Sequence, residues 1–143
     1  DIKKVYGVSV GSIAELLYIL GYNHEELECE ILSKNFSTLQ NINIRNFIYS
    51  YGIDDALNIL NWIKTLMIKK CVHPSITFEQ LYNMKKIELN IISTNINLYK
   101  HDVFCHTTTP DMPILNAIRM SINIPLLFSS VIYNNHFYID GSL

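Results

Sequence analysis

Residues 3–12 read KKVYGVSVGS, and this stretch predicts a short strand that turns directly into a helix. Ser9 stands between Gly7 and Gly11 in a G-x-S-x-G pattern, which is typical of a nucleophile elbow, a strained turn that presents a serine hydroxyl. Both glycines are predicted to lie where a β-carbon would collide with neighbouring backbone. Helix amides begin just after the serine, so the positive end of the helix dipole would face an attacking oxygen.

The residues around the serine support this interpretation. Val8 and Val10 fill the variable positions of the motif. Apolar residues at helical spacing follow, and a glycine ends the segment: Ile13, Leu16, Leu17, Leu20 and Gly21. The alternative is a glycine-rich turn between a strand and a helix that carries an ordinary serine.

Composition narrows the class of protein. The chain has 143 residues, of which 49% are hydrophobic, and this suits one globular domain with one core. A net charge of −2 gives no reason to expect nucleic acid as a partner. No apolar run reaches the ~18 residues of a membrane span, and no signal peptide is recognisable after Asp1. Three widely spaced cysteines favour a reducing compartment, so we expect an intracellular protein, cytosolic or peripherally associated with a membrane.

Periodicity and capping signals predict the elements that follow the elbow. Asn23 with Glu26, and Thr77 with Gln80, resemble capping boxes, and Asp54 is a candidate N-cap. The predicted helices cover residues 10–20, 23–34, 55–70, 77–84 and 114–120, and the second of them is expected to bury Leu27, Ile31 and Leu32. The predicted strands cover residues 87–94 and 102–107, and a hairpin covers 131–139. This order of elements indicates an α/β sandwich.

Other polar groups are also candidate functional residues. His101 and His106 flank a predicted strand, and either is a candidate base for Ser9, although a structural role is the commoner one for a strand histidine. The glutamates of residues 25–30 are read as a solvated helix face rather than an acid/base pair. The histidines and cysteines form no C-x-x-C or H-x-x-x-H pair, so we expect no metal site and no cofactor.

Three blocks of the chain together resemble the patatin-like phospholipases. The first is the GVSVGSI block of residues 7–13, followed by an apolar helix. The second is TFEQLY at residues 77–82, which leads to the strand of residues 89–94. The third runs from TPDMPILNAIRMS at residues 109–121 through IPLLF at residues 124–128 to YIDG at residues 138–141. The resemblance extends from Lys3 to Leu143.

The resemblance implies a fold and a mechanism. The implied fold is a three-layer α/β/α sandwich around a mostly parallel central sheet, present as one partial domain over residues 1–143 that is truncated at both ends. Ser9 matches the family nucleophile, and Asp140, followed by Gly141, matches the aspartate that acts as general base. Such a Ser-Asp dyad would cleave phospholipid or acylglycerol esters through an acyl-serine intermediate, at a membrane or lipid interface. The chemistry needs no metal, and calcium stays open as an aid to membrane binding.

Two departures from the family pattern concern activity. The resemblance implies an oxyanion hole in a glycine-rich loop before the serine strand, and the sequence begins after the place where that loop is expected; losing an oxyanion donor lowers the rate by roughly 100- to 1,000-fold. Ser142 stands where the family has glycine or alanine.

Other interpretations remain open at this point. A catalytically inactive patatin-like domain that binds lipid or a protein partner is the alternative function. An α/β-hydrolase with a Ser-His-Asp triad is a further one, but it requires a histidine after the acid, and no histidine follows Asp140. Arg119 is a candidate for a lipid phosphate or, more simply, for a structural ion pair. Residues 36–51 are read as a loop or short helix packed on the core, with docking to a lipid interface as the alternative.

Overall fold

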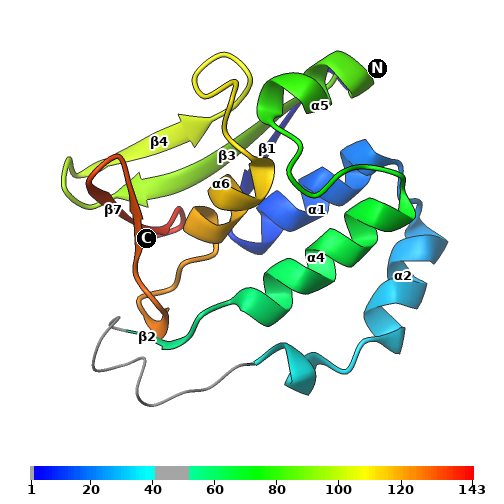
Figure 1. Ribbon diagram of the computed structural model, residues 1–143, viewed down its shortest axis with the longest axis horizontal. Coiled ribbons are helices and arrows are strands. Elements are labelled where there is room, and N and C mark those ends of the chain that lie inside the picture. Colours follow the sequence, from blue (N-terminus) through cyan, green and yellow to red (C-terminus); the bar gives the residue numbers. More distant parts are fainter. Residues whose placement is uncertain (1, 41–51) are drawn as a thin grey trace.

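The structure is a computed structural model that describes residues 2–40 and 52–143, and it has a mixed α/β architecture (Figure 1). The main sheet contains β1 (Lys4–Val8), β3 (Glu88–Asn95), β4 (Lys100–Phe104), β6 (Val131–Tyr133) and β7 (His136–Asp140). The short strands β2 (Gly52–Asp54) and β5 (Leu126–Phe128) pair in parallel beside it. The helices are α1 (Val10–Leu20), α2 (His24–Ser33), α4 (Leu57–Lys69), α5 (Phe78–Lys85) and α6 (Ile114–Ser121), with a 3₁₀ helix η1 (Phe36–Leu39). The predicted α/β class is confirmed.

Strand β3 organises the sheet because it pairs with three other strands. β1 runs parallel to the first part of β3, and Val8 pairs with Ile92. β7 runs antiparallel to the last part of β3, and Asp140 pairs with Ser93. β4 pairs with β3 over residues 91–95, so it occupies the other edge. β1 and β7 therefore lie end to end along one edge of β3, and their C-terminal ends meet.

The prediction of a mostly parallel sheet is wrong for the strands described. Only the β1–β3 pair of the main sheet is parallel, whereas β4 and β7 pair antiparallel with β3 and β6 pairs antiparallel with β7. For the β3–β4 and β6–β7 pairs the physical reason is the length of the connections. β4 and β7 each follow a short turn after their neighbours β3 and β6, and such a turn reverses the chain direction.

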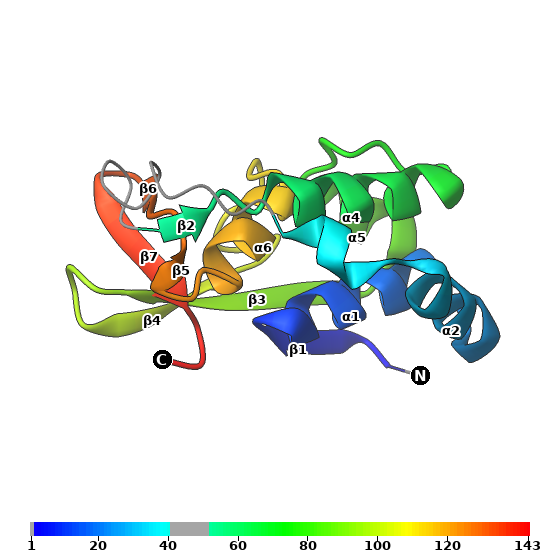
Figure 2. The same cartoon turned by 90° about the horizontal axis from the view of Figure 1, so that it is seen from below.

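Helices α1, α4, α5 and α6 contribute side chains to one core against the sheet, and α2 lies outside α1 and α4. Figure 2 shows α4 and α6 on the same side of β3, and Leu16 of α1 belongs to the same core cluster as Ile63 of α4 and Ile118 of α6. On β1 the buried side chains alternate with exposed ones, and the exposed Tyr6 faces away from the core. The second helical layer of the expected three-layer sandwich is not found among the described residues.

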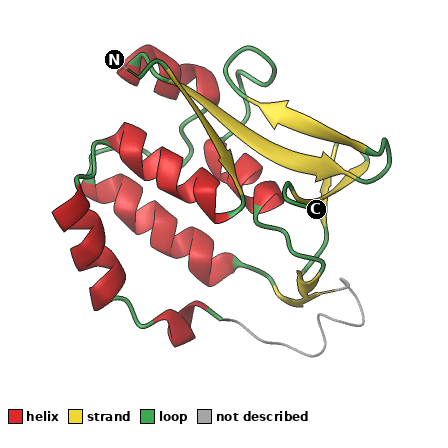
Figure 3. Ribbon diagram, turned by 180° about the vertical axis from the view of Figure 1, so that it is seen from behind, coloured by secondary structure: helices red, strands yellow, loops and turns green. Residues whose placement is uncertain are grey.

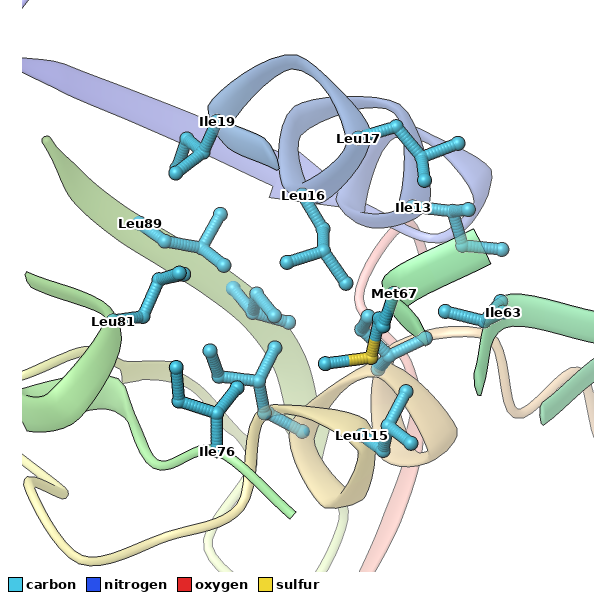
Figure 4. Packing of buried hydrophobic residues seen from close by; sticks show 14 of the residues in the cluster. Ile13, Leu16, Leu17, Ile19, Ile63, Met67, Ile76, Leu81, Leu89 and Leu115 are labelled. Atoms are coloured by element: carbon cyan, nitrogen blue, oxygen red, sulfur yellow. The ribbon is translucent and has the colours of Figure 1, made fainter. Parts of the chain in front are cut away.

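The core lies between this helical layer and the sheet. Leu16 of α1, Leu66 of α4 and Ile91 of β3 are fully buried in one continuous cluster. In Figure 4, Leu16 and Ile19 of α1 lie on the side of the helix that faces Leu89 of β3. The cluster therefore fixes α1, and with it the turn before α1, against the sheet.

Several local predictions are confirmed. Asn23 and Thr77 both form complete capping boxes, with Glu26 and Gln80 respectively. The β6–β7 hairpin turns at Asn134 and Asn135, which have φ angles of 48° and 62°. Asparagine tolerates this left-handed conformation better than most residues, so these signals could be read without the tertiary structure.

Two local predictions are wrong. Asp54 does not cap α4; it ends β2, and its Oδ1 accepts a hydrogen bond from the backbone N–H of Ala56, which precedes the helix. Helix α2 contains no buried residue, although Leu27 packs partly against the core. The predicted burial of Ile31 and Leu32 fails because α2 covers the outside of α1 and α4. Residues 41–51 of the predicted insertion lie outside the described residues.

Across residues 2–40 and 52–143, each helix is too short or too polar to cross a lipid bilayer.

A network of polar side chains surrounds Asp102 at the C-terminal end of β3. The Asp102 carboxylate accepts hydrogen bonds from Asn95 Nδ2 at 3.0 Å and from the Tyr138 hydroxyl at 2.7 Å, and Lys100 Nζ lies 2.9 Å from it. Partial burial raises the pKa of the Asp102 carboxyl, but the hydrogen bonds from Asn95, Lys100 and Tyr138 outweigh burial and hold the pKa below its usual value. The network therefore stabilises the ionised form of Asp102.

We expect this network to contribute to stability at neutral pH and to fail in acid. The unfolded carboxyl titrates at about pH 3.9, so the contribution is complete above that pH and is lost as the pH falls through the lower pKa of the folded state. In urea unfolding followed by Trp62 fluorescence between pH 5 and pH 2, Asp102→Asn should lose less stability than the wild type. Asp111→Asn, at an exposed position, should follow the wild-type pH dependence. Parallel curves for Asp102→Asn and wild type would contradict the assignment.

Candidate active site

Ser9 occupies the single-residue turn between β1 and α1. Its backbone angles, φ 53° and ψ −130°, lie in a region that residues with a side chain rarely adopt. Such a conformation costs on the order of 1–3 kcal/mol and persists only where its surroundings enforce it. The strained strand-to-helix turn that the G-x-S-x-G motif predicts is therefore present.

Two further serines enforce this turn. The backbone N–H of Ser9 donates to Ser121 Oγ at 2.9 Å, and that hydroxyl donates in turn to the Ile92 carbonyl oxygen at 2.6 Å. The Ser12 hydroxyl donates to the Ser9 carbonyl oxygen at 2.6 Å. Ser12 and Ser121 are both fully buried, and sequence reasoning gave them no role. No local pattern indicates Ser121, because its partner is more than a hundred residues away.

The two glycines of the motif have different structural roles. A β-carbon on Gly7 would overlap the Cα of Ser12 and come within 2.8 Å of its backbone nitrogen. A β-carbon on Gly11 would meet nothing within 4 Å, and Gly11 has no positive φ. The steric argument is confirmed for Gly7 and wrong for Gly11, because Gly11 lies on the exposed side of the first turn of α1.

The two glycines therefore make a matched pair for a stability test. We expect Gly7→Ala to lower the free energy of unfolding by about 1–3 kcal/mol, since the strand and the helix must separate to admit the methyl group. We expect Gly11→Ala to leave it unchanged or to raise it by up to about 1 kcal/mol, because alanine favours the helix. Urea unfolding followed by Trp62 fluorescence measures both changes. An equal loss in the two variants would refute the steric difference.

Asp140 lies beside Ser9, although 131 residues separate them along the chain. Ser9 Oγ is 2.5 Å from Asp140 Oδ2, and the hydroxyl donates to the carboxylate. The sheet register explains the contact: β1 ends opposite Ile92 and β7 ends opposite Ser93, which is the next residue of β3. Figure 3 shows the end of β1 and the C-terminus from behind.

The Asp140 carboxylate is buried, with 1% of the residue exposed, and its orientation is held. The backbone N–H and the hydroxyl of Ser142 donate to Oδ1 at 2.9 and 2.7 Å. Oδ1 thus accepts two hydrogen bonds from Ser142, and Oδ2 is directed at Ser9. Ser142, the departure from the family pattern, adds a hydrogen bond that glycine or alanine cannot make. A β-carbon on Gly141 would overlap the Ile92 carbonyl oxygen, so this position needs glycine.

A second group of polar contacts holds the strand that carries Asp140. The backbone N–H of Asp140 donates to the backbone carbonyl oxygen of Asn123. The side-chain amide of Asn123 donates to the carbonyl oxygen of Tyr138. Arg119 donates to Asn123 Oδ1 at 3.0 Å and to the Ser129 carbonyl oxygen at 2.7 Å. Burial lowers the pKa of Arg119, and the charges of Asp55 and Asp54 oppose that shift. These contacts give Arg119 a structural role.

The other candidate groups lie elsewhere. His101 Nδ1 is 3.0 Å from Thr94 Oγ1, and His106 stacks on Tyr82 with ring centroids 3.8 Å apart. The polar group at Ser9 Oγ is a carboxylate, whereas the triad interpretation requires a histidine there.

Two glutamates of α2 form ion pairs with lysines and not a pair of carboxyl groups with each other. Glu26 pairs with Lys70 at 2.7 Å, and Glu30 pairs with Lys69 at 2.5 Å. The interpretation of residues 25–30 as a solvated helix face agrees with these contacts, and the structure adds the two ion pairs. Within residues 2–40 and 52–143, no three His, Cys, Asp or Glu side chains are grouped so that they could hold a metal ion.

The arrangement can perform acyl transfer chemistry. A serine hydroxyl needs an adjacent base to become a nucleophile, and the Asp140 carboxylate is within hydrogen-bond distance of it. The first amides of a helix have no acceptor within the helix, and in α1 these include the amides of Val10 and Gly11, next to Ser9. Such amides are suited to an oxyanion.

Sequence comparison with known proteins identifies the family of this chain. A sequence model of the family described as "Patatin-like phospholipase" matches residues 1–143. The chain is 35% identical, over 99% of its length, to "Probable lipid hydrolase 463L" of Invertebrate iridescent virus 6. It is 30% identical, again over 99% of its length, to "Uncharacterized protein R571" of Acanthamoeba polyphaga mimivirus. The alignments cover 50% and 47% of those proteins, so the chain spans about half the length of these relatives.

A solved structure shares the fold. The crystal structure of VipD from Legionella pneumophila superposes with a TM-score of 0.67, covering 99% of this chain and 40% of VipD. The sequence identity is 13%, so this likeness concerns the fold alone.

Proposed function

Since the chain belongs to the patatin-like phospholipase family, we propose that it is a lipid acyl hydrolase in which Ser9 is the nucleophile and Asp140 the general base. Its substrates would be carboxylic esters of phospholipids or acylglycerols, taken from a membrane or another lipid interface. The observation that carries the proposal is the 2.5 Å contact between Ser9 Oγ and Asp140 Oδ2 in a strained turn at the start of a helix.

In the proposed first half-reaction, Asp140 takes the proton of the Ser9 hydroxyl while Oγ attacks the ester carbonyl carbon. The carbonyl oxygen becomes an oxyanion, and the amides at the start of α1 stabilise it. When the intermediate collapses, the bond from the carbonyl carbon to the alcohol oxygen breaks, and Asp140 returns its proton to the departing alcohol. Ser9 then carries the acyl group as an ester.

In the second half-reaction, a water molecule replaces the alcohol. Asp140 takes a proton from the water, whose oxygen attacks the acyl-serine, and the proton passes to Ser9 Oγ as the fatty acid leaves. Asp140 alone would serve as base and acid in both steps. The hydrogen bonds from Ser142 to Oδ1 support this role, because they keep Oδ2 directed at the serine.

A fluorophosphonate probe, which reacts with activated serines, tests the proposal. We expect covalent labelling of the wild-type protein at Ser9, located by mass spectrometry, and none of Ser9→Ala. Asp140→Asn should label much more slowly, whereas Ser75→Ala, which changes an exposed serine outside the site, should label normally. Absence of labelling in a folded wild-type protein would favour the alternative of an inactive domain that binds lipid or a protein partner.

A further inference from the structure

An apolar groove of about 240 Å³ begins at the residue that follows the catalytic serine. Val10, Ile13, Ala14 and Leu17 of α1 line one wall. Their spacing of three and four residues places them in one stripe along the helix. At 1.5 Å per residue the stripe is about 10 Å long, from beside Ser9 toward the C-terminal end of α1.

The opposite wall comes from α2 and α4. Leu27 and Ile31, four residues apart on α2, line it together with Trp62 and Leu66 of α4. In Figure 4, Leu17 and Ile13 lie on a different side of α1 from Leu16, which points into the core. The groove thus lies on another side of α1 than the one that faces β3, and its floor residues Ile13, Leu17 and Leu66 also belong to the core cluster.

The floor of the groove is buried and its rim is open. Ile13 and Leu17 are buried, whereas Val10 is 72% exposed and Ile31 is 46% exposed. The only charged side chain in the lining is Glu30, whose carboxylate pairs with Lys69 Nζ. An exposed, almost wholly apolar groove beside a nucleophile is suited to a hydrocarbon chain rather than to a polar ligand.

We propose that this groove binds the acyl chain of the ester that Ser9 attacks, with the carbonyl end at Val10 and the chain running along α1 toward Trp62. The proposal rests on the proposed function of Ser9, and it adds the position and the chemistry of the acyl subsite. A larger hollow of about 490 Å³ beside Lys64 and Arg119 includes neither residue that flanks Ser9, so it does not compete for this role.

Trp62 is the single tryptophan of the sequence, and it reports on the groove without any catalysis. A bromine atom quenches indole fluorescence on contact, so 10-bromodecanoate should quench Trp62 saturably, and decanoate should not. Ala14→Phe, which fills the groove, and Ile31→Glu, which places a charge at its rim, should each raise the half-saturating concentration at least tenfold. Leu32→Phe, which adds the same ring at an exposed position of α2 outside the groove, should leave it unchanged.

Turnover supplies the second measurement. The ratio of kcat/KM for 4-nitrophenyl decanoate to that for 4-nitrophenyl acetate should fall at least tenfold in Ala14→Phe and Ile31→Glu, because tenfold is the lower limit of what one buried methylene contributes. Leu32→Phe should keep the wild-type ratio. If quenching is absent, or if the ratio does not change, the acyl subsite is refuted. If neither ester is hydrolysed by the folded wild type, the proposed function fails, and the quenching titration still decides whether the groove binds a chain.

Discussion

Replacing Ser9 by alanine is expected to lower kcat/KM for the hydrolysis of 4-nitrophenyl butyrate by about 10⁴-fold or more. The Ser9 oxygen is the atom that would attack the ester, and alanine supplies no substitute for it. The backbone contacts that hold the turn, from Ser121 and Ser12, involve the main chain of residue 9 and remain available in the variant. The protein should therefore fold normally while losing its activity.

The control for this variant is Ser75→Ala, an exposed serine outside the site, which should retain the wild-type rate. Unfolding curves of both variants show whether the fold is kept. A Ser9→Ala protein that keeps more than a tenth of the wild-type kcat/KM would mean that another group attacks the ester, and the proposed mechanism would then be wrong.

Replacing Asp140 by asparagine is expected to lower kcat/KM by about 10²- to 10⁴-fold, the usual contribution of a general base. The amide has the same shape as the carboxylate and still accepts hydrogen bonds from Ser142, but it cannot take the proton of Ser9. The variant thus separates the proton transfer from the packing of a residue that is 1% exposed.

A double variant tests whether the two residues act together. Ser9→Ala combined with Asp140→Asn should be no slower than Ser9→Ala alone, since residues that act as one unit show non-additive losses. Asp111→Asn, at an exposed position, should leave the rate unchanged. If the double variant lost the product of the two separate factors, Asp140 would contribute independently of Ser9, and the dyad would be refuted.

Most local structure could be predicted from short patterns. The turn at Ser9, the capping boxes of Asn23 and Thr77, and the hairpin at Asn134 and Asn135 all depend on residues within a few positions of one another. In each case the conformation depends on neighbouring backbone groups and side chains. The family resemblance also indicated the α/β class, because it rests on the order and spacing of three blocks.

Predictions of burial and close packing that rested on a local pattern alone failed. Gly7 and Gly11 are equivalent in the motif, but only Gly7 faces another backbone segment. Ile31 and Leu32 belong to an apolar pattern on α2, but the helix lies over α1 and α4 and leaves both side chains exposed. An apolar pattern indicates which residues prefer burial, and only the packing decides which of them are buried.

The sequence by itself determined the nucleophile elbow, since the geometry of a strand–turn–helix is a property of consecutive residues. The family resemblance named Asp140 as the partner of Ser9, and the tertiary structure shows how its carboxylate comes to lie 2.5 Å from the serine. That contact requires β1 and β7 to occupy the same edge of β3 from opposite directions, so that their ends meet at Ile92 and Ser93. Pairing between segments more than a hundred residues apart depends on the packing of the whole sheet, which no local pattern records.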